Sequence, residues 1–404
     1  MQSPAQRTET PENWDRSGLP AWTYFNEELH EIEKDLLFRR HWQLACHQSD
    51  VPEPGSYQCL DMVGERALIL RGKDGVVRAF HNVCRHRGAR VVADQRGRCK
   101  HALTCPFHGW SYGLDGRLNA PLRPKTLPDL DPQAHGLKPI EMEIWQGFVF
   151  IRFQEGDQPA VAEVMARHLD EAAPYGIENM VPAHKRLWSH SLAANWKSVR
   201  DVDNEGYHVP IAHPALQDLY GKNYHDEAYV EGSNRSFATF NEGPSRLWSV
   251  KHYKKILPEM AHLPEDNRQA WLYLGLFPNT VIGIYPDSAT FYQEYPMAPG
   301  KTIQRGGVYR YRQESRELRL ARYLSSRIDR ITQDEDDQLI EWSWEAMQSS
   351  GFDGIVLSDL EYGVRSHHDQ LRALIPAMTL DEEPESVAEA NAAMMGEGQR
   401  SAAE

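Results

Sequence analysis

Residues 84–110 read CRHRGARVVADQRGRCKHALTCPFHGW, and they hold three cysteines and three histidines. Thiolates and imidazole nitrogens are common metal ligands. Five cysteines in 404 residues are too few for a disulfide framework. The stretch therefore predicts a metal site, and the rest of the chain has to be explained around it.

Two short patterns carry the candidate ligands, Cys84-x-His86 and Cys105-x-x-His108. The 18 residues between them are enough for a strand, a turn around 94–97 and a returning strand, which would bring the two loop tips together. A rival pair, Cys99 and His101, stands too close to Cys105 to form a loop of its own. Two cysteines and two histidines fit either a Rieske [2Fe-2S] cluster or a structural zinc ion.

Composition limits the possible partners. The formal net charge of -14 argues against a nucleic-acid partner, which would favour a basic surface. The N-terminal residues contain no apolar signal segment, and no run approaches the roughly 18 apolar residues of a membrane span. We therefore expect a soluble cytoplasmic protein without a membrane partner.

The texture of the sequence predicts an α+β protein with several parts. Residues 1–42 are expected to form an N-terminal helical segment, because apolar residues recur at helical spacing from residue 24, and to pack on the larger domain. Residues 43–155 contain short apolar runs with hairpin punctuation, which predict a small all-β domain. Residues 156–381 mix helical and strand patterns and are expected to form this larger domain, for which the resemblance described below implies the catalytic role. Residues 382–404 are small and polar and predict a flexible tail.

If the first site holds a Rieske cluster, that cluster has no open coordination position for a substrate or for oxygen. We therefore expect a second metal site elsewhere in the chain. Glu205, His208 and His213 lie together in residues 195–214. The His-x4-His spacing does not place both rings on one helical face. Because Pro210 breaks a helix, we expect the helix to end near His208 and His213 to fold back from an irregular segment.

Two histidines and one carboxylate form the facial triad of a non-haem Fe(II) oxygenase. The acidic run in residues 331–347 supplies the carboxylate candidates Asp334, Asp336 and Asp337. Such a run is also typical of the solvated N-terminus of a helix. The residues by themselves leave both interpretations open.

The sequence from about 24 to 372 resembles the Rieske non-haem iron oxygenases, the family of aromatic-ring-hydroxylating oxygenase alpha subunits. The resemblance rests on CRHRG and CPFHGWSYGLDGRL, which begin at Cys84 and Cys105. It implies a small all-β Rieske [2Fe-2S] domain and a larger helix-grip-like α/β catalytic domain with an antiparallel sheet. It also implies that Asp336, opening a late helix of the type EDxxxxE, is the third ligand of a mononuclear Fe(II).

The resemblance further implies a homotrimer in which electrons pass from the cluster of one subunit to the iron of the next. His108 would reach Glu205, which orients His208. Asp201 and Asp203 are nearby carboxylates that could share this bridging role. The sequence has no GxGxxG fingerprint, so a separate NAD(P)H-dependent flavin/iron-sulfur reductase is implied.

The bridging position is commonly Asp in the family, and Glu205 resembles the branch that oxidises quaternary ammonium compounds. This resemblance implies oxidative N-demethylation of a small betaine with O2, proline betaine first, releasing formaldehyde and the demethylated amine. An aromatic-ring hydroxylase or aromatic O-demethylase with the same metals is the alternative. A quaternary ammonium is recognised by aromatic faces, but the strand-like alternation of the candidates is equally typical of core, so the substrate residues stay unknown. The candidates are Trp248, Tyr253, Trp271, Tyr273, Tyr285, Phe291 and Tyr292.

Overall fold

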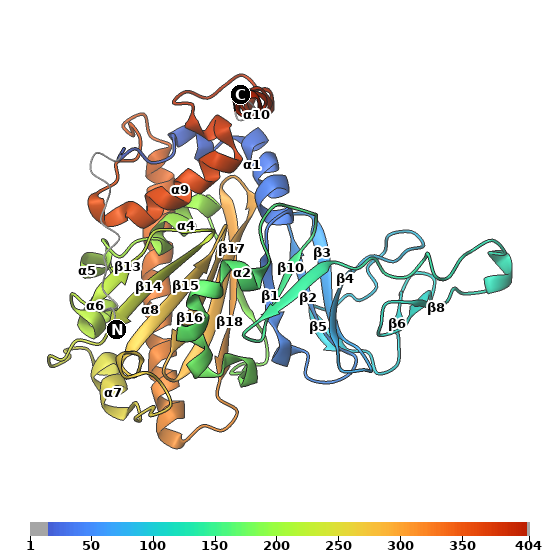
Figure 1. The fold of residues 1–404 in the computed structure, drawn as a ribbon, viewed down its shortest axis with the longest axis horizontal. Coiled ribbons are helices and arrows are strands. Elements are labelled where there is room, and N and C mark those ends of the chain that lie inside the picture. The colour runs from blue at the N-terminus through green and yellow to red at the C-terminus, as the bar shows by residue number, and fades with distance from the viewer. Residues whose placement is uncertain (1–14, 402–404) are drawn as a thin grey trace. The chain divides into compact units, whose positions relative to one another are not determined.

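The computed structural model describes residues 15–401, with side chains described through residue 396. The backbone divides into two compact units, which interleave along the sequence. The small unit comprises Phe38–Glu163 and Gly176–Pro182, and the large unit comprises the chain up to Leu37, Val164–Tyr175 and the chain from Ala183 onward. The predicted α+β class is confirmed, with antiparallel sheets in both units (Figure 1).

The small unit is built of three small antiparallel sheets. The largest has the order β4-β3-β2-β5, and its strands are β2 (Ser56–Met62), β3 (Glu65–Arg71), β4 (Val77–His81) and β5 (Arg96–Arg98). The second consists of β6 (Leu103–Thr104), β7 (Ser111–Tyr112) and β8 (Leu118–Ala120). The third has the order β1-β10-β9, with β1 (Gln43–His47), β9 (Glu141–Trp145) and β10 (Phe148–Arg152).

The hairpin predicted around residues 94–97 is not formed. Instead β5 pairs with β2, so that Gly97 lies opposite Tyr57. The close approach requires glycine, because a Cβ at position 97 would lie 2.5 Å from the Tyr57 hydroxyl oxygen. The two cluster loops therefore flank a strand that belongs to the neighbouring sheet.

The large unit is organised around a seven-strand antiparallel sheet. Its order is β12-β18-β17-β16-β15-β14-β13. The strands are β12 (Trp188–Leu192), β13 (Tyr224–Asp226), β14 (Ser233–Thr239), β15 (Ala270–Leu276), β16 (Thr280–Tyr285), β17 (Ser288–Ala298) and β18 (Lys301–Arg310). β15 and β16 run through the apolar segments in which the sequence predicts strands.

Helix α8 (Arg316–Met347) runs along one face of this sheet (Figure 1). The Ser315 hydroxyl caps its start by accepting a hydrogen bond from the Leu318 amide. Ala321, Leu324 and Ile328, spaced three or four residues apart, pack in one core cluster with Trp271 and Tyr285. The burial of this stripe holds α8 against the sheet.

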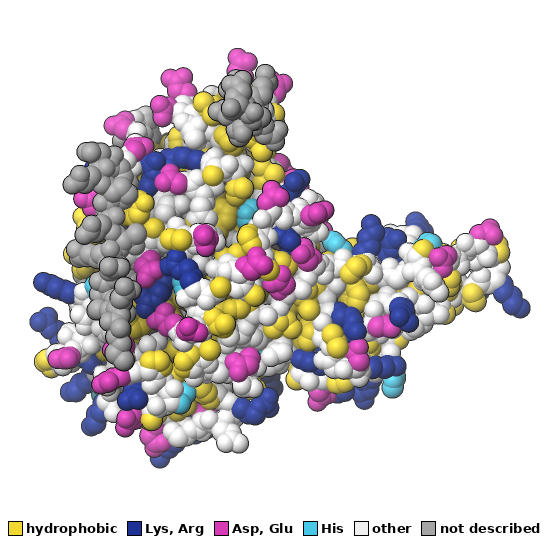
Figure 2. Space-filling model, in the orientation of Figure 1, with side chains coloured by type: hydrophobic (Ala, Val, Ile, Leu, Met, Phe, Trp, Pro, Cys, Tyr) yellow, Lys and Arg dark blue, Asp and Glu magenta, His cyan; other side chains and the backbone are white. Residues whose placement is uncertain are grey.

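Shorter helices surround the sheet. They are α1 (Glu27–Glu33), followed by a π-helical turn (Lys34–Arg39), and α3 (Leu169–Ala172), α4 (Trp196–Asp203), α5 (Val209–Ala212), α6 (Pro214–Tyr220), α7 (Trp248–Ile256) and α9 (Tyr362–Leu374). Helix α2 (Val161–Val164) lies where the chain passes from the small unit to the large one. Within residues 15–401, none of the helices combines the length and the hydrophobicity needed to span a bilayer. On the face drawn in Figure 2, basic side chains are interspersed with acidic ones.

The C-terminal segment differs from the flexible tail predicted for residues 382–404. Up to residue 401 it contains helix α10 (Val387–Ser401). The Val387 side chain is fully buried, and its amide donates a hydrogen bond of 2.7 Å to Glu28 of α1. Sequence composition alone does not reveal this anchoring, because it depends on a partner more than 350 residues away.

Two candidate metal centres

The cysteine of each cluster loop begins a tight turn with the same backbone pattern. The amides of Cys84 and Cys105 each donate to the carbonyl five residues later, at 2.7 and 2.8 Å. Gly88 and Gly109 each donate to the carbonyl of the cysteine four residues earlier, at 3.0 Å. Both glycines have a positive φ, of 75° and 69°, a conformation that favours glycine. The loops are therefore shaped by their own backbone.

The side chains of the loops divide into a thiol pair and an imidazole pair. Cys84 and Cys105 are buried, whereas the rings of His86 and His108 lie nearer the surface with centroids 4.6 Å apart. The Trp110 ring stacks on His86 at 4.9 Å. Among the described residues, the atoms of these loops do not gather within 4.8 Å as the ligands of one ion would. The donor set fits a two-iron cluster with cysteines on one iron and histidines on the other.

The other cysteines of the small unit have structural surroundings. The Cys99 amide donates to the Gly55 carbonyl at 2.9 Å, and its side chain packs against the core. Cys59 is buried with its thiol 3.5 Å from the Asp94 carbonyl, and Cys46 is buried in β1. Cys99 of the rival pair is thus held by a backbone hydrogen bond to Gly55 and by packing against the core.

In the large unit, a break between helices presents the two candidate histidines. Helix α4 ends at Asp203, and His208 immediately precedes α5. Pro210 occupies the first turn of α5, where its missing N–H costs no hydrogen bond. His213 lies between α5 and α6. The expectation of a helix ending near His208 and of an irregular segment after Pro210 was wrong, because proline starts a new helical turn there.

Three ligand atoms converge at this break. Nε2 of His208 and Nε2 of His213 are 3.0 Å apart, and Oδ1 of Asp336 lies 3.6 and 2.9 Å from them. Asp336 lies well inside α8, so the expectation that it opens a helix was wrong. These three residues form the candidate metal group of the described chain, with all ligand atoms within 4.8 Å.

The outer nitrogens of both rings face carboxylates. Nδ1 of His208 contacts Oε1 of Glu205, and Nδ1 of His213 lies 2.9 Å from Oε2 of Glu335. If each neutral ring donates its Nδ1–H to the carboxylate, both Nε2 atoms carry lone pairs. Those lone pairs then point at each other and at Oδ1 of Asp336, which a cation between them would satisfy. The donor set therefore fits an Fe(II) ion with two histidines and one carboxylate.

The local charge favours a cation as well. Burial lowers the pKa of His208, but Glu205 and Asp336 outweigh it and the net pKa is raised. The pKa of His213 is raised in the same way, by Asp336 and Glu335 against burial. Sequence reasoning missed Glu335, although it directly precedes Asp336. The sequence feature that could have revealed Glu335 is its position next to a predicted ligand, since Glu205 likewise lies close to His208 in the sequence.

The alternative carboxylates are engaged elsewhere. Asp201 accepts hydrogen bonds from Tyr24 at 2.7 Å and His368 at 2.8 Å. Asp337 lies 3.2 Å from Nε2 of His190, and Asp334 is exposed.

Asp203, in contrast, interacts both with residues around the metal group and with the charge of Asp336. It pairs with Arg200 at 3.1 Å and accepts a hydrogen bond of 3.2 Å from Tyr292. Burial and the charge of Asp336 raise its pKa to about 6 despite the opposing effect of Arg200. Asp203 is therefore an electrostatic neighbour of Asp336.

The candidate aromatic residues differ in exposure. Tyr253, Trp271, Tyr285 and Phe291 are buried, and Trp248 is exposed. Tyr273 and Tyr292 are partly exposed. The Tyr273 hydroxyl lies 3.1 Å from that of Tyr220, a residue that sequence reasoning did not single out.

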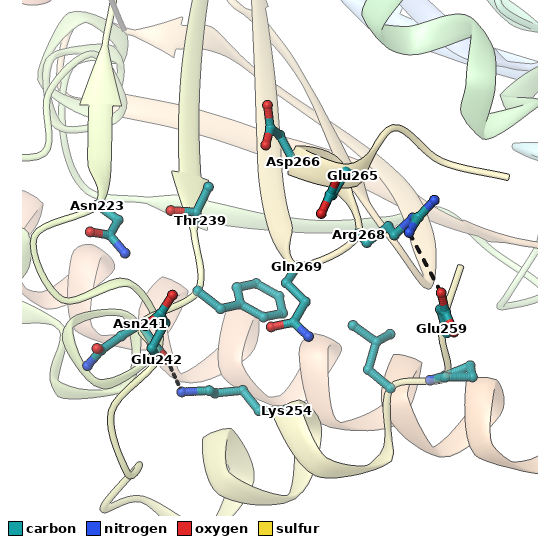
Figure 3. A pocket seen from close by; sticks show the side chains of 13 residues that line it. Asn223, Thr239, Asn241, Glu242, Lys254, Glu259, Glu265, Asp266, Arg268 and Gln269 are labelled. Carbon is teal, nitrogen blue, oxygen red and sulfur yellow. Dashed lines mark hydrogen bonds and ion pairs between the residues drawn. The ribbon is translucent and has the colours of Figure 1, made fainter. Parts of the chain in front are cut away.

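A surface cavity of roughly 950 Å³ lies elsewhere in the large unit (Figure 3). It lies between the end of β14 and α7, where Lys254 contacts the Asn241 carbonyl and Arg268 pairs with Glu259 at 3.7 Å. None of the candidate ligands lines it. This cavity is thus distinct from the metal group.

Comparison with known proteins identifies both parts of the chain. Residues 41–131 match the Rieske [2Fe-2S] domain, and residues 178–377 match the catalytic domain of the ring hydroxylating alpha subunit. A solved quaternary ammonium Rieske monooxygenase, described in connection with carnitine oxidation by gut microbiota and inter-subunit electron transfer, shares the fold. Its TM-score is 0.75 at 24% identity, covering 89% of this chain and 95% of the other.

Two relatives show the similarity in sequence. The carnitine monooxygenase oxygenase subunit of Acinetobacter baumannii is 28% identical over 341 residues, covering 82% of this chain and 83% of the relative. The glycine betaine monooxygenase oxygenase subunit of Pseudomonas aeruginosa is 36% identical over 198 residues, 49% of this chain. That match spans 45% of the relative, less than half its length. The chain is a member of the Rieske non-haem iron oxygenase family, with a Rieske [2Fe-2S] domain and a catalytic domain that has a mononuclear iron site.

Proposed function

We propose that the protein is a terminal oxygenase that removes an N-methyl group from a small quaternary ammonium compound, with proline betaine as the first candidate. Two observations support this. Both relatives described above are named for quaternary ammonium substrates. Glu205, the residue by which the chain resembles that branch, contacts the His208 ring.

We assign the metal ligands as follows. Cys84, His86, Cys105 and His108 would hold the [2Fe-2S] cluster, and His208, His213 and Asp336 would hold the iron. When bound, the two metal centres supply one electron each and a site at which O2 is activated. Glu205 and Glu335 would fix the orientation of the two iron-binding rings and raise their basicity.

Glu205 has a second proposed role. Its carboxylate would accept a contact from His108 of another subunit and so connect the two centres in a homotrimer. Electrons would reach the cluster from a separate NAD(P)H-dependent flavin/iron-sulfur reductase, at the cytoplasmic location that the sequence predicts. No oxygenase subunit can complete a turnover without such a donor.

The proposed reaction balances with one O2, two electrons and two protons. One oxygen atom is inserted into an N-methyl C–H bond and the other leaves as water. The resulting N–CH2OH group loses formaldehyde when its N–C bond breaks, which leaves the tertiary amine and releases a proton. The residues around the iron would position the methyl group and exclude water.

A second candidate is an aromatic-ring hydroxylase. The large component of a naphthalene 1,2-dioxygenase system from Pseudomonas aeruginosa is 33% identical over 257 residues, covering 58% of this chain and 55% of the relative. The same metals would serve this reaction or an aromatic O-demethylation.

The deciding measurement is oxygen uptake and formaldehyde release by the iron-loaded protein with a surrogate reductase. The panel contains proline betaine, glycine betaine, carnitine, choline, several arenes and methoxybenzoates. Formaldehyde in equal amount to the oxygen consumed with one quaternary compound supports the proposal. Hydroxylated product from an arene alone would contradict it, and formaldehyde from a methoxybenzoate alone would indicate an O-demethylase.

A further inference from the structure

One carboxylate of the large unit has surroundings that the metal site does not use. Asp329 lies on α8 seven residues before Asp336, two helical turns away on the same face. At a rise of 1.5 Å per residue, their Cα atoms are about 10 Å apart. Asp329 is partly exposed although core residues surround it. A part of the residue is therefore accessible at the protein surface, while burial of its carboxyl group dominates the electrostatics.

Tyrosine hydroxyls meet at Asp329. Tyr285 donates a hydrogen bond of 3.2 Å to its Oδ1. The Tyr285 hydroxyl lies 3.4 Å from that of Tyr273, which in turn lies 3.1 Å from that of Tyr220. The Tyr220 ring packs edge-on against Trp271, with ring centroids 5.8 Å apart, and the Tyr285 ring stacks face-on against it at 4.1 Å. The carboxylate thus lies at one end of an aromatic wall formed by Tyr220, Tyr273, Tyr285 and Trp271.

This wall extends toward the metal group through Asp203. The negative charge of Asp203 raises the pKa of Tyr273, as that of Asp329 does, while burial has the largest effect. Asp203 in turn interacts with Asp336 and with His208. The next residue after His208, Val209, belongs to the same core cluster as Tyr220 and Tyr285. Ile328, directly before Asp329, lies in that cluster too, so one packed core connects the neighbourhoods of the metal group and of Asp329.

Asp329 has fewer stabilising polar contacts than the buried carboxylate of Asp287. Asp287 accepts hydrogen bonds from Tyr253, Ser325 and Ser288. In the part of the chain that the structure describes, no lysine or arginine forms an ion pair with Asp329, and Asp287 adds repulsion. Burial is the main cause that raises the pKa of Asp329 to about 8. An acid without a counter-ion at this position is costly to the fold.

We propose that Asp329 is the anionic group that binds the quaternary ammonium head of the substrate, with Tyr273 and Tyr285 providing aromatic surface beside it. This inference rests on the proposed function. An ammonium nitrogen about 5 Å from the carboxylate would leave one of its methyl groups within a few ångströms of the iron ligands, given the helical spacing of Asp329 and Asp336. Asp329 would thus be a specificity-determining residue.

The proposal has a measurable consequence in the release of protons on binding. With a pKa of about 8, Asp329 is largely protonated at pH 7 in the free protein. A bound cation favours the ionised form, so binding at pH 7 releases up to one proton. At pH 9 the group is already ionised and binding releases none. Cation affinity should therefore rise with pH up to about 8 and then level off.

The groups that face Asp329 do not mimic this response. Tyr220, Tyr273 and Tyr285 have pKa values raised by burial and stay neutral in this range. Burial also raises the pKa of Asp287, whose oxygens are hydrogen-bonded. Glu294 has a raised pKa of about 8, but it is fully buried against Arg200.

The test compares a ligand that has a quaternary ammonium head group with an isostere whose head group is uncharged, by titration calorimetry in buffers of different ionisation heat. Glycine betaine and 3,3-dimethylbutanoate differ only in a nitrogen or a carbon at the head group, and the other cations of the panel extend the test. Asp329→Asn should weaken cation binding by at least about tenfold. It should leave the affinity for the isostere unchanged and abolish proton release. Glu345→Gln removes the same charge from an exposed position on α8 and should change none of these values.

The outcomes separate the two proposals. Wild-type protein that binds none of the cations contradicts the proposed function and removes this inference with it. Wild-type binding that Asp329→Asn retains with unchanged affinity contradicts the inference alone. The proton release of the wild-type protein needs no variant, so the inference is testable even if Asp329→Asn does not fold. Cation binding without proton release at pH 7 would overturn it.

Discussion

The two candidate metal centres are built in opposite ways. The loops at Cys84 and Cys105 each bring their own ligands within four residues and are shaped by backbone hydrogen bonds. The candidate iron ligands come from a helix break and from the middle of a helix more than 120 residues later. In the second centre, carboxylates hold the rings in place. The first centre is local and the second depends on tertiary packing.

The difference has a physical origin. A cluster held on two tight turns requires only that the turns face each other, and Gly88 and Gly109 supply the backbone conformation. Three ligands on separate elements need a rigid scaffold, which the packing of α8 against the sheet provides. Mutations should therefore act locally in the first centre and over longer distances in the second.

The largest effect is expected from Cys84→Ser. Loss of one thiolate should remove the cluster and its visible absorption entirely, because no other cysteine of the cluster loops can replace it. Cys99→Ser, in the same unit, should keep the spectrum. A Cys84→Ser protein with an unchanged spectrum would contradict the ligand assignment.

The next largest effect separates the two centres. His213→Ala and Asp336→Ala should each lose bound iron and at least about 99% of turnover while the cluster absorption remains. Asp337→Asn, whose carboxylate faces His190 and Gln333 instead, serves as the control and should retain iron. Metal analysis and the visible spectrum measured together decide this, and loss of the cluster in the large-unit variants would argue against independent centres.

A smaller effect tests the two carboxylates behind the rings. Glu205→Gln and Glu335→Gln should each reduce turnover about 10 to 100-fold. Only Glu205→Gln should also slow electron passage from the reduced cluster in a single-turnover experiment, with both metals retained. Equal single-turnover rates for the two variants would show that Glu205 only orients the His208 ring and does not carry electron transfer.

The smallest effect concerns the tuning of the cluster. The Tyr112 hydroxyl lies 3.2 Å from Sγ of Cys84, and hydrogen bonds to cluster sulfurs raise the reduction potential. Tyr112→Phe should lower the potential measured by redox titration, with little change in the visible spectrum. A potential equal to that of the wild-type protein would show that the hydroxyl does not interact with the sulfur in the loaded centre.

The fold was predictable where patterns are local. Residues 43–155, where short apolar runs predict hairpins, contain the hairpin of β3 and β4, and residues 156–381, where strand patterns occur, contain β15 and β16. The hairpin around residues 94–97 did not, because Gly97 fits closely against Tyr57 of a distant strand. Pairing choices of this kind depend on contacts that a local pattern does not contain.

The candidate site shows the same limit. His208 and His213 were predicted from their spacing, a nearby carboxylate and the resemblance, and Asp336 through the resemblance, and the structure brings the three together. Glu335 was missed because an acidic run does not reveal which of its members faces a ring. Asp329 was missed because its burial depends on Tyr285 and the neighbouring sheet.

The sequence by itself determined the family, the two cofactors and the cluster loops, because Cys84-x-His86 and Cys105-x-x-His108 carry their ligands and turn glycines in short segments. Only the tertiary structure decided which carboxylate of α8 faces the histidines and which stays beside the tyrosines. A helix places side chains around its whole circumference, and only packing against the sheet selects the buried face. Residues 329, 335 and 336 therefore acquire their different surroundings when α8 packs against the sheet.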